Sequence, residues 1–227
     1  MKLLVFLILS ASAFADPAPK HTCRILFLNG PDSAPEKLQL FDGSKCTEVE
    51  LPRMNFSKVY ELAGGPLTLS MLSAPPVDPK NIPAGAPGVV VAETMADFYL
   101  LLSSDPANQI APVRLQVIDA SAEKLKLGQM LWFNLSPDQV GGVLGSEKIS
   151  LQPGGRATVN APAAGAQDYV VNLAFRIPGN ELLYPLCETK WRHDPRSRSV
   201  AFIMTETGVR SPRVMVFPDY REPVEKR

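Results

Sequence analysis

Short segments of alternating apolar and polar residues recur along the chain, and turn-forming residues separate them. Residues 37–41 and 47–51 alternate most clearly, and the Asp42-Gly43 pair between them is a strong hairpin signal. A period of two places successive side chains on opposite faces of a strand. Further strand-type runs cover residues 24–28, 58–62, 66–72, 88–92, 97–102 and 113–117. Short strands at this spacing predict an antiparallel β-sandwich.

The second half of the chain repeats the plan of the first about a hundred positions later. The matching segments are Leu26-Phe27-Leu28-Asn29 with Leu131-Trp132-Phe133-Asn134, Gly43-Ser44 with Gly145-Ser146, and the runs 98–102 and 112–117 with the runs 200–204 and 212–217. A repeat of this length indicates tandem domains, because solenoid and propeller repeats are far shorter. We therefore expect an all-β protein with two antiparallel β-sandwich domains, over residues 16–120 and 121–227. A short linker or single turn near residues 119–127 should join them.

The first residues predict an export signal and not a part of the fold. Lys2 provides a positive start, residues 3–9 are apolar but too few to span a bilayer, and Ala13-Phe14-Ala15 fits the small-x-small cleavage pattern. We expect cleavage after Ala15 and a periplasmic or extracellular location. No later stretch approaches the roughly twenty apolar residues of a transmembrane helix, so no membrane span is expected.

Charge and motifs exclude several classes of function. The chain has 23 basic and 23 acidic residues, so loss of the signal with its one lysine leaves a formal charge of about −1. Nucleic acids and anionic membranes are held by net basic surfaces, so neither is expected as the main partner. The sequence contains no nucleophile elbow, phosphate-binding loop, dinucleotide fingerprint, zinc-protease helix or calcium loop. We therefore expect no cofactor and no enzymatic activity.

Three cysteines, Cys23, Cys46 and Cys187, are an odd number for an oxidising compartment. One bond at most can form within the chain. Cys23 with Cys46 is the preferred pair, because they flank two candidate neighbouring strands in the same half. The alternative is that all three are small buried residues of a protein that needs no crosslink.

The start of the first half carries a family resemblance. Residues 24–43 contain a strand, Asn29, the turn Pro31-Asp32-Ser33-Ala34-Pro35, an alternating strand and Asp42-Gly43. This order resembles the opening of a bacterial cell-envelope domain family of unknown function, and residues 55–60 and 62–69 resemble the strands that follow in that family. The second half keeps only the Pro-Asp core of the turn. The resemblance implies immunoglobulin-like or transthyretin-like sandwiches and supplies no catalytic residues.

Cys187 and His193 lie in one stretch that also contains carboxylates. A thiol with an imidazole could serve a hydrolase, and the same groups could bind zinc. No second histidine and no CxxC spacing nearby completes either set, so a polar loop between strands is the simpler interpretation. The only other histidine, His21, is expected in a mobile terminus of the mature protein.

The same stretch is basic and contains a tryptophan. Trp191 could stack on a sugar or a base while neighbouring arginines bind an anionic group. The alternative is a solvated loop whose arginine stems cover apolar surface. If the protein has a ligand surface, we expect it to include Tyr184, Lys190, Trp191, Arg192, His193, Arg196 and Arg198.

These observations favour a non-catalytic binding or structural module of the bacterial cell envelope. Its partner would be an envelope protein or a glycan, recognised by surface loops on a rigid scaffold. Two alternatives stay open. One is a carbohydrate-binding module that uses Trp191 and Tyr184, and the other is a hydrolase or metal site around Cys187 and His193.

Overall fold

The computed structural model describes residues 20–79, 81–206 and 208–220, and these residues form sixteen β-strands in four sheets. The export signal predicted for residues 1–15 lies outside them. Nowhere in this described part does the chain form a helix with the length and hydrophobicity that a membrane span requires.

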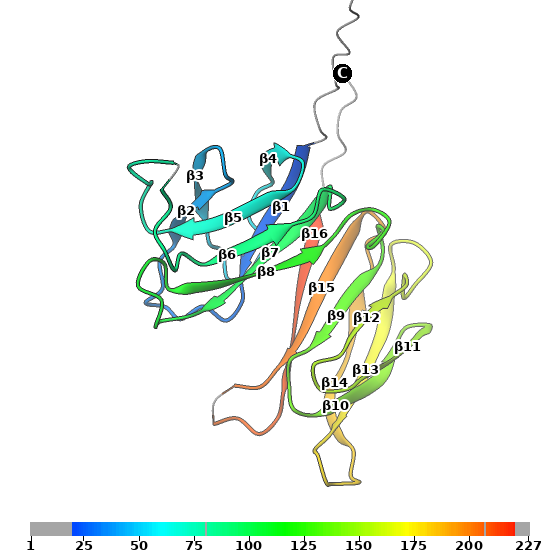
Figure 1. Ribbon diagram of the computed structural model, residues 1–227. Coiled ribbons are helices and arrows are strands. Elements are labelled where there is room, and N and C mark those ends of the chain that lie inside the picture. Colours follow the sequence, from blue (N-terminus) through cyan, green and yellow to red (C-terminus); the bar gives the residue numbers. More distant parts are fainter. Residues whose placement is uncertain (1–19, 80, 207, 221–227) are drawn as a thin grey trace, which may run out of the picture.

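The first half of the chain forms two four-stranded sheets with an apolar core between them (Figure 1). The sheets have the strand orders β4-β1-β7-β8 and β3-β2-β5-β6. Their strands are β1 (Lys20–Phe27), β2 (Lys37–Phe41), β3 (Cys46–Glu50), β4 (Tyr60–Gly64), β5 (Leu67–Leu72), β6 (Gly88–Val91), β7 (Asp97–Ser104) and β8 (Val113–Asp119). The core includes Phe27, Leu40, Leu69 and Leu100, all of which are at most 1% exposed.

The second half forms two further sheets, with the strand orders β12-β9-β15-β16 and β11-β10-β13-β14. Their strands are β9 (Met130–Asn134), β10 (Gln139–Leu144), β11 (Glu147–Leu151), β12 (Arg156–Val159), β13 (Asp168–Arg176), β14 (Tyr184–Arg192), β15 (Ser197–Met204) and β16 (Arg213–Tyr220). Trp132, Val171 and Leu173 lie in the core between these sheets.

The two halves have the same topology, strand for strand, because β1 to β8 pair in the same pattern as β9 to β16. The predicted all-β protein with two tandem sandwiches is therefore confirmed. Each half also contains one parallel pair, β1 with β7 and β9 with β15, so two of the sheets are mixed. The strands of each parallel pair are far apart in sequence, and this separation leaves room for the crossover that a parallel neighbour needs.

Strand β13 shows how the alternating pattern produces a sheet with one buried face. Tyr169, Val171, Leu173 and Phe175 are buried, whereas the residues between them are mostly exposed. β-Branched and aromatic residues suit this half-buried, pleated surface. Burial of such a row removes it from water, which stabilises the fold by about 25 cal/mol for each Å² of apolar surface.

The β2–β3 hairpin forms at the predicted Asp-Gly signal. Asp42 Oδ1 accepts hydrogen bonds from the backbone N–H of Ser44 and Lys45, at 3.0 and 2.8 Å, and Gly43 takes the left-handed conformation with φ of +88°. Burial by itself would raise the pKa of Asp42, but the hydrogen bonds from Lys45 and Ser44 lower it below its ordinary value. The turn therefore fixes the register of β2 and β3.

A third apolar cluster joins the two halves. Sheet β4-β1-β7-β8 contributes Leu26 and Tyr99, and sheet β12-β9-β15-β16 contributes Phe202 and Phe217. Phe56, from the first half, stacks on Tyr99 with 4.4 Å between ring centroids and meets Phe217 of the second half edge to face at 6.3 Å. Both faces of these sheets are therefore buried, and the halves lie side by side (Figure 1).

The repeated sequence segments serve the same role in both halves. Leu26 and Leu131 both contribute to the cluster between the halves, whereas Phe27 and Trp132 both point into the core of their own sandwich. The repeated residues therefore form both the cores of the two sandwiches and the surfaces that join the halves.

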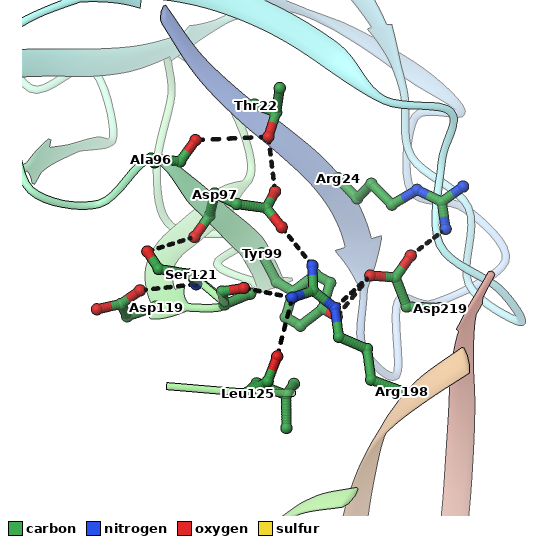
Figure 2. A network of polar contacts seen from close by, with 11 residues as sticks. Thr22, Arg24, Ala96, Asp97, Tyr99, Asp119, Ser121, Leu125, Arg198 and Asp219 are labelled. Carbon is green, nitrogen blue, oxygen red and sulfur yellow. Dashed lines mark hydrogen bonds and ion pairs between the residues drawn. The ribbon is translucent and has the colours of Figure 1, made fainter. Parts of the chain in front are cut away.

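A buried polar network lies at the edge of the third cluster (Figure 2). Asp219 on β16 accepts hydrogen bonds from Arg198 Nε at 3.0 Å, from the Tyr99 hydroxyl at 2.7 Å and from Arg24 Nη1 at 2.5 Å. Arg198 also donates to Asp97 and to the backbone carbonyls of Ala120 and Leu125. The network ties β1, β7 and the segment that joins the halves to β15 and β16.

The structure changes two sequence-based expectations in the first half. The proposed Cys23–Cys46 disulfide is absent: none of the three cysteines, all of which are described, is in a disulfide. Cys23 points into the core from β1, whereas Cys46 starts β3 in the other sheet. His21, expected in a mobile terminus, is 1% exposed in β1, and its ring nitrogens lie 2.7 and 2.6 Å from the carbonyl oxygens of Met95 and Gly65.

Candidate functional site

A cavity of about 420 Å³ lies in the second half, between β14 and β16. These strands are the edges of the two sheets of this sandwich, and they contact each other on the same side of it. The end of β14, the turn into β15, the start of β15 and the end of β16 border the cavity. Protein pockets for small molecules have volumes of about 300–1,000 Å³, so this cavity has the size of a ligand site.

Aromatic rings form one wall of the cavity. Trp191 of β14 is partly buried and lies parallel to the fully buried Trp132, with 6.1 Å between ring centroids and 8° between ring planes. Tyr169, its cross-strand neighbour on β13, meets Trp191 edge to face at 6.3 Å. Such ring pairs restrict each other's orientation. The part of the indole that lines the cavity is therefore held in a fixed position.

Tyr169 also adds a neutral polar group to the wall. Its hydroxyl lies 3.5 Å from the sulfur of Met130, which accepts a hydrogen bond from it. Burial raises the pKa of Tyr169 to about 12, because the phenolate would lose its hydration. The hydroxyl therefore keeps its proton at neutral pH and does not repel an anionic ligand.

His193 lines the cavity with a nitrogen that makes no hydrogen bond. The residue is 6% exposed, its backbone N–H donates to the carbonyl of Gln167 at 2.9 Å, and Nε2 is buried without a partner in the described structure. Gly128, which has a left-handed φ of +81°, lies beside this ring, and a Cβ at this position would be in ordinary van der Waals contact with Nε2 at 3.5 Å. Buried polar groups in proteins are nearly always paired, so an unpartnered imidazole nitrogen on a residue that lines the cavity points to a ligand or a water molecule as its partner.

The charged residues around the cavity differ in whether they have an oppositely charged partner. Arg192 Nη1 lies 3.4 Å from Asp168 Oδ1, and Arg196 Nη2 lies 3.1 Å from Asp194 Oδ2. The hydrogen bonds from Arg196 hold the pKa of Asp194 below its ordinary value. Lys190 is exposed on β14 and has no carboxylate partner in the described part of the chain. The alternation of side chains along β14 places Lys190, with its exposed cross-strand neighbour Val170, on the outer face of the sheet, opposite to Trp191.

Four of the seven residues proposed from sequence lie together at this cavity: Lys190, Trp191, Arg192 and His193. The other three do not line it. Tyr184 is at the opposite end of β14, where it packs against Phe175 and accepts a hydrogen bond from Asn180, and Arg196 is exposed beside Asp194. The expectation for Arg198 is corrected, because its side chain is 7% exposed and serves the network between the halves.

The sequence analysis missed several cavity residues, among them Tyr169, Ser199 and Tyr220. They come from β13, β15 and β16, so they meet the Trp191 stretch only in the folded sandwich. Tyr169 carried a usable signal in the sequence, because it belongs to an alternating strand, and in the structure it pairs with Trp191 across the hairpin. Ser199 is a polar residue directly before an apolar strand run, a pattern that does not by itself indicate a cavity.

The structure separates Cys187 from His193. Six positions along an extended strand correspond to about 20 Å. Cys187 pairs with Leu173 and packs against the domain core, and burial raises the pKa of its thiol, so the reactive thiolate is disfavoured. No group of three or more His, Cys, Asp or Glu side chains with metal-site geometry occurs within the described ranges. Cys187 and His193 are therefore not brought together in the described structure.

The structure also changes which residues could serve a carbohydrate-binding module. Trp191 and Tyr184 lie seven positions apart on β14, about 23 Å along the strand, and both are partly buried against the core. They do not form one exposed platform. Trp191 with Tyr169 and Tyr220 at the cavity is the aromatic group that the fold brings together.

Comparisons with known proteins add no assignment: no protein-family model matches the chain, and no curated protein matches it.

Proposed function

We propose that this chain is a non-catalytic binding module, exported to the bacterial envelope, that holds a small ligand or one group of a larger partner in the cavity between β14 and β16. The observation that carries this proposal is the buried, unpaired Nε2 of His193 beside the fixed indole of Trp191. A polar atom without a partner costs stability, and a ligand that hydrogen-bonds to it recovers that loss. Export is inferred from the leader-like sequence of residues 1–15.

The first sandwich acts as a support in this proposal. Its contact with the second sandwich runs through β15 and β16, the strands whose first and last residues border the cavity. Ser197, Ser199 and Tyr220 are therefore attached to a sheet that is packed on both faces. Binding groups on rigid elements lose little conformational freedom when a ligand arrives.

The test is a thermal-shift screen of the purified protein against sugars, sugar acids, organic acids and amino acids. A ligand that binds only the folded state raises the midpoint of unfolding. We expect at least one of these compound classes to raise it, and we expect the shift to disappear in Trp191→Ala and His193→Ala. Tyr184→Ala is the matched control, because Tyr184 is also a partly buried aromatic residue of β14 but does not line the cavity.

Three results would contradict the proposal. The first is a screen in which no compound shifts the midpoint. The second is a shift that survives equally in Trp191→Ala and His193→Ala. A shift that disappears in Tyr184→Ala as well would also count against it, because this pattern reports general destabilisation of the sandwich.

A further inference from the structure

A cleft of about 470 Å³ lies between the two halves of the chain, beside the cluster that joins them. It is lined by β8 and β12, the edge strands of the two sheets that face each other, and by part of β9. None of its lining residues borders the cavity between β14 and β16. Boundaries between domains are frequent locations of ligand sites, and the volume suits a small molecule.

The register of β9 and β12 shows which side chains of the second half face this cleft. Leu131 and Phe133 pack against the cluster that joins the halves, so they point toward the first half. Arg156 pairs with Phe133, and Thr158 pairs with Leu131. Directly paired side chains lie on the same face of a sheet, whereas Val159 alternates into the core of its own sandwich. The side chains of Arg156 and Thr158 therefore face the first half across the cleft.

On the opposite wall, two uncharged side chains of β8 point toward the second half. Ile118 belongs to the cluster between the halves, and Gln116 lies two positions before it, on the same face of the strand. Asp119 follows Ile118 and pairs with Phe98, a residue of the first sandwich's core. Its Oδ1 accepts a hydrogen bond from the backbone N–H of Ser121 at 2.9 Å. The face of β8 that borders the cleft is therefore neutral.

Arg156 gives the cleft a positive charge. It is exposed on β12, and its guanidinium forms no ion pair or hydrogen bond with another described residue. The other charged residues of the lining, Asp119 and Lys124, have opposite signs, so the lining as a whole is positive. A guanidinium suits an oxyanion, because two of its N–H groups can donate in parallel to one carboxylate.

Apolar side chains lie beside this charge. Leu131 and Phe133 are only partly buried in the cluster between the halves, and both line the cleft. Phe133 stacks on Phe202, with 5.4 Å between ring centroids and 15° between ring planes, which restricts its orientation. A ligand that covers these two side chains removes apolar surface from water, and this burial favours binding.

From these observations we propose that the cleft binds an organic anion with an apolar body. The acidic group of the ligand pairs with Arg156, and its apolar body covers Leu131 and Phe133. Gln116 and Thr158 add uncharged hydrogen-bonding groups on the two walls. The cleft is separate from the cavity between β14 and β16, so either site can fail its test while the other stands.

The test compares 2-naphthoate with 2-naphthamide by isothermal titration calorimetry. The two compounds share one apolar ring system and differ in charge. Charge-assisted hydrogen bonds are stronger than neutral ones, but water weakens an exposed pair, so we expect the acid to bind about five- to tenfold more tightly. Added salt should reduce this difference, because the ion pair is near the surface.

Variants connect the binding to the cleft. Arg156→Gln should bring the affinity for the acid down to that for the amide, whereas Arg176→Gln, which changes an exposed arginine of β13 outside the cleft, should leave the ratio unchanged. Thr158→Trp should prevent binding of both compounds, because the larger side chain fills the cleft. Thr189→Trp is its control, since Thr189 is an exposed threonine of β14 outside the cleft.

Several outcomes would overturn the inference. They are no binding of either compound, equal binding of acid and amide by the unmodified protein, a ratio that survives in Arg156→Gln, and binding that survives in Thr158→Trp. Trp191→Ala and His193→Ala should leave the affinity for 2-naphthoate unchanged, since neither residue lines this cleft. Loss of binding in these two variants would place the naphthoate in the other cavity and would also count against the inference. The sugars and sugar acids of the thermal-shift screen lack an apolar body of this kind, so we do not expect them to bind in the cleft.

Discussion

Arg198 and Asp219 face each other on β15 and β16, with 3.0 Å between Arg198 Nε and Asp219 Oδ2. Asp219 is fully buried and receives two further donors from the first half, the Tyr99 hydroxyl and the Arg24 guanidinium. Burial alone would lower the pKa of Arg198, but Tyr99 and the carboxylates of Asp97 and Asp219 raise it above its ordinary value. Asp219 therefore pairs with two arginines at the boundary between the halves, and Asp97 is the second carboxylate at Arg198 (Figure 2).

Removal of this carboxylate should strongly destabilise the protein. In Asp219→Ala, Asp97 is the one anionic partner that Arg198 keeps among the described residues, and Arg24 loses its pairing with Asp219. Breaking a buried ion pair by removal of one partner costs about 3–5 kcal/mol. We expect a loss of this size in the free energy of unfolding, measured in urea.

The control for Asp219→Ala is Glu48→Gln, which removes the exposed Lys37–Glu48 pair at 2.8 Å. Exposed pairs contribute about 0–1 kcal/mol. A loss in Asp219→Ala no larger than in this control would show that the network does not hold the halves together.

The two sandwiches should unfold together. The cluster between them is as well buried as either domain core, so neither half can open without exposing Phe202 and Phe217. We expect a single calorimetric transition, and we expect Phe202→Ala to lower the stability of both halves by about 3–5 kcal/mol. Two resolved transitions in the unmodified protein would mean that the halves are independent.

Substitution by alanine should lower the stability by very different amounts at two adjacent glycines of β10. A Cβ on Gly142 would lie 2.0 Å from the carbonyl oxygen of Asn172 on β13, and its φ of +152° is unfavourable for other residues. A Cβ on Gly141 would lie 3.3 Å from the carbonyl oxygen of Ile149 on β11, a tight but adjustable contact.

We therefore expect Gly142→Ala to lower the free energy of unfolding by well over 1 kcal/mol or to prevent folding, since the change combines a clash with an unfavourable φ. Gly141→Ala should cost clearly less. Equal stability of the two variants in urea unfolding would contradict the packing of β10 between β11 and β13.

The titration of Tyr169 should make the stability of the fold depend on pH in a defined direction. Its pKa is about 12 in the folded protein, against an ordinary value of 10.0. The folded state therefore binds this proton more tightly than the unfolded state. The stabilising contribution is complete below pH 10 and is lost as the pH rises from about 10 to 12.

Tyr169→Phe should remove this part of the alkaline loss of stability. The tyrosinate absorbance of the unmodified protein minus that of Tyr169→Phe measures the titration directly. A midpoint near pH 10 in this difference would mean that Tyr169 is open to water and does not form the cavity wall described above.

The sequence predicted the architecture because the outward and inward positions of most strands differ in polarity. The repeat of Leu26 to Asn29 at Leu131 to Asn134 correctly predicted two similar halves. The packing of the two halves was missed, although it left a signal: residues 98–102 and 200–203 are apolar at every position. A strand that is apolar on both faces has both faces covered, here by the domain core and by the other half.

The candidate site was only partly predictable. The stretch from Lys190 to His193 was recognised because a tryptophan, a histidine and basic residues are adjacent in sequence. Arg198 belongs to the same basic stretch but is buried, since Asp97 of the first half and Asp219 on the neighbouring strand β16 pair with it. Local composition identifies charged residues, whereas only the fold determines which of them meet an opposite charge and which face a cavity.

The central claim is that the second sandwich binds a ligand between β14 and β16. The most direct measurement is a ¹H–¹⁵N NMR titration of the protein with the compound that gives the largest upward shift of the unfolding midpoint in the thermal-shift screen. The account predicts shift changes concentrated at residues 128–130, 190–194 and 197–199, with the first sandwich unaffected. Saturating ligand that leaves these amides unchanged, or that shifts amides elsewhere instead, would contradict it.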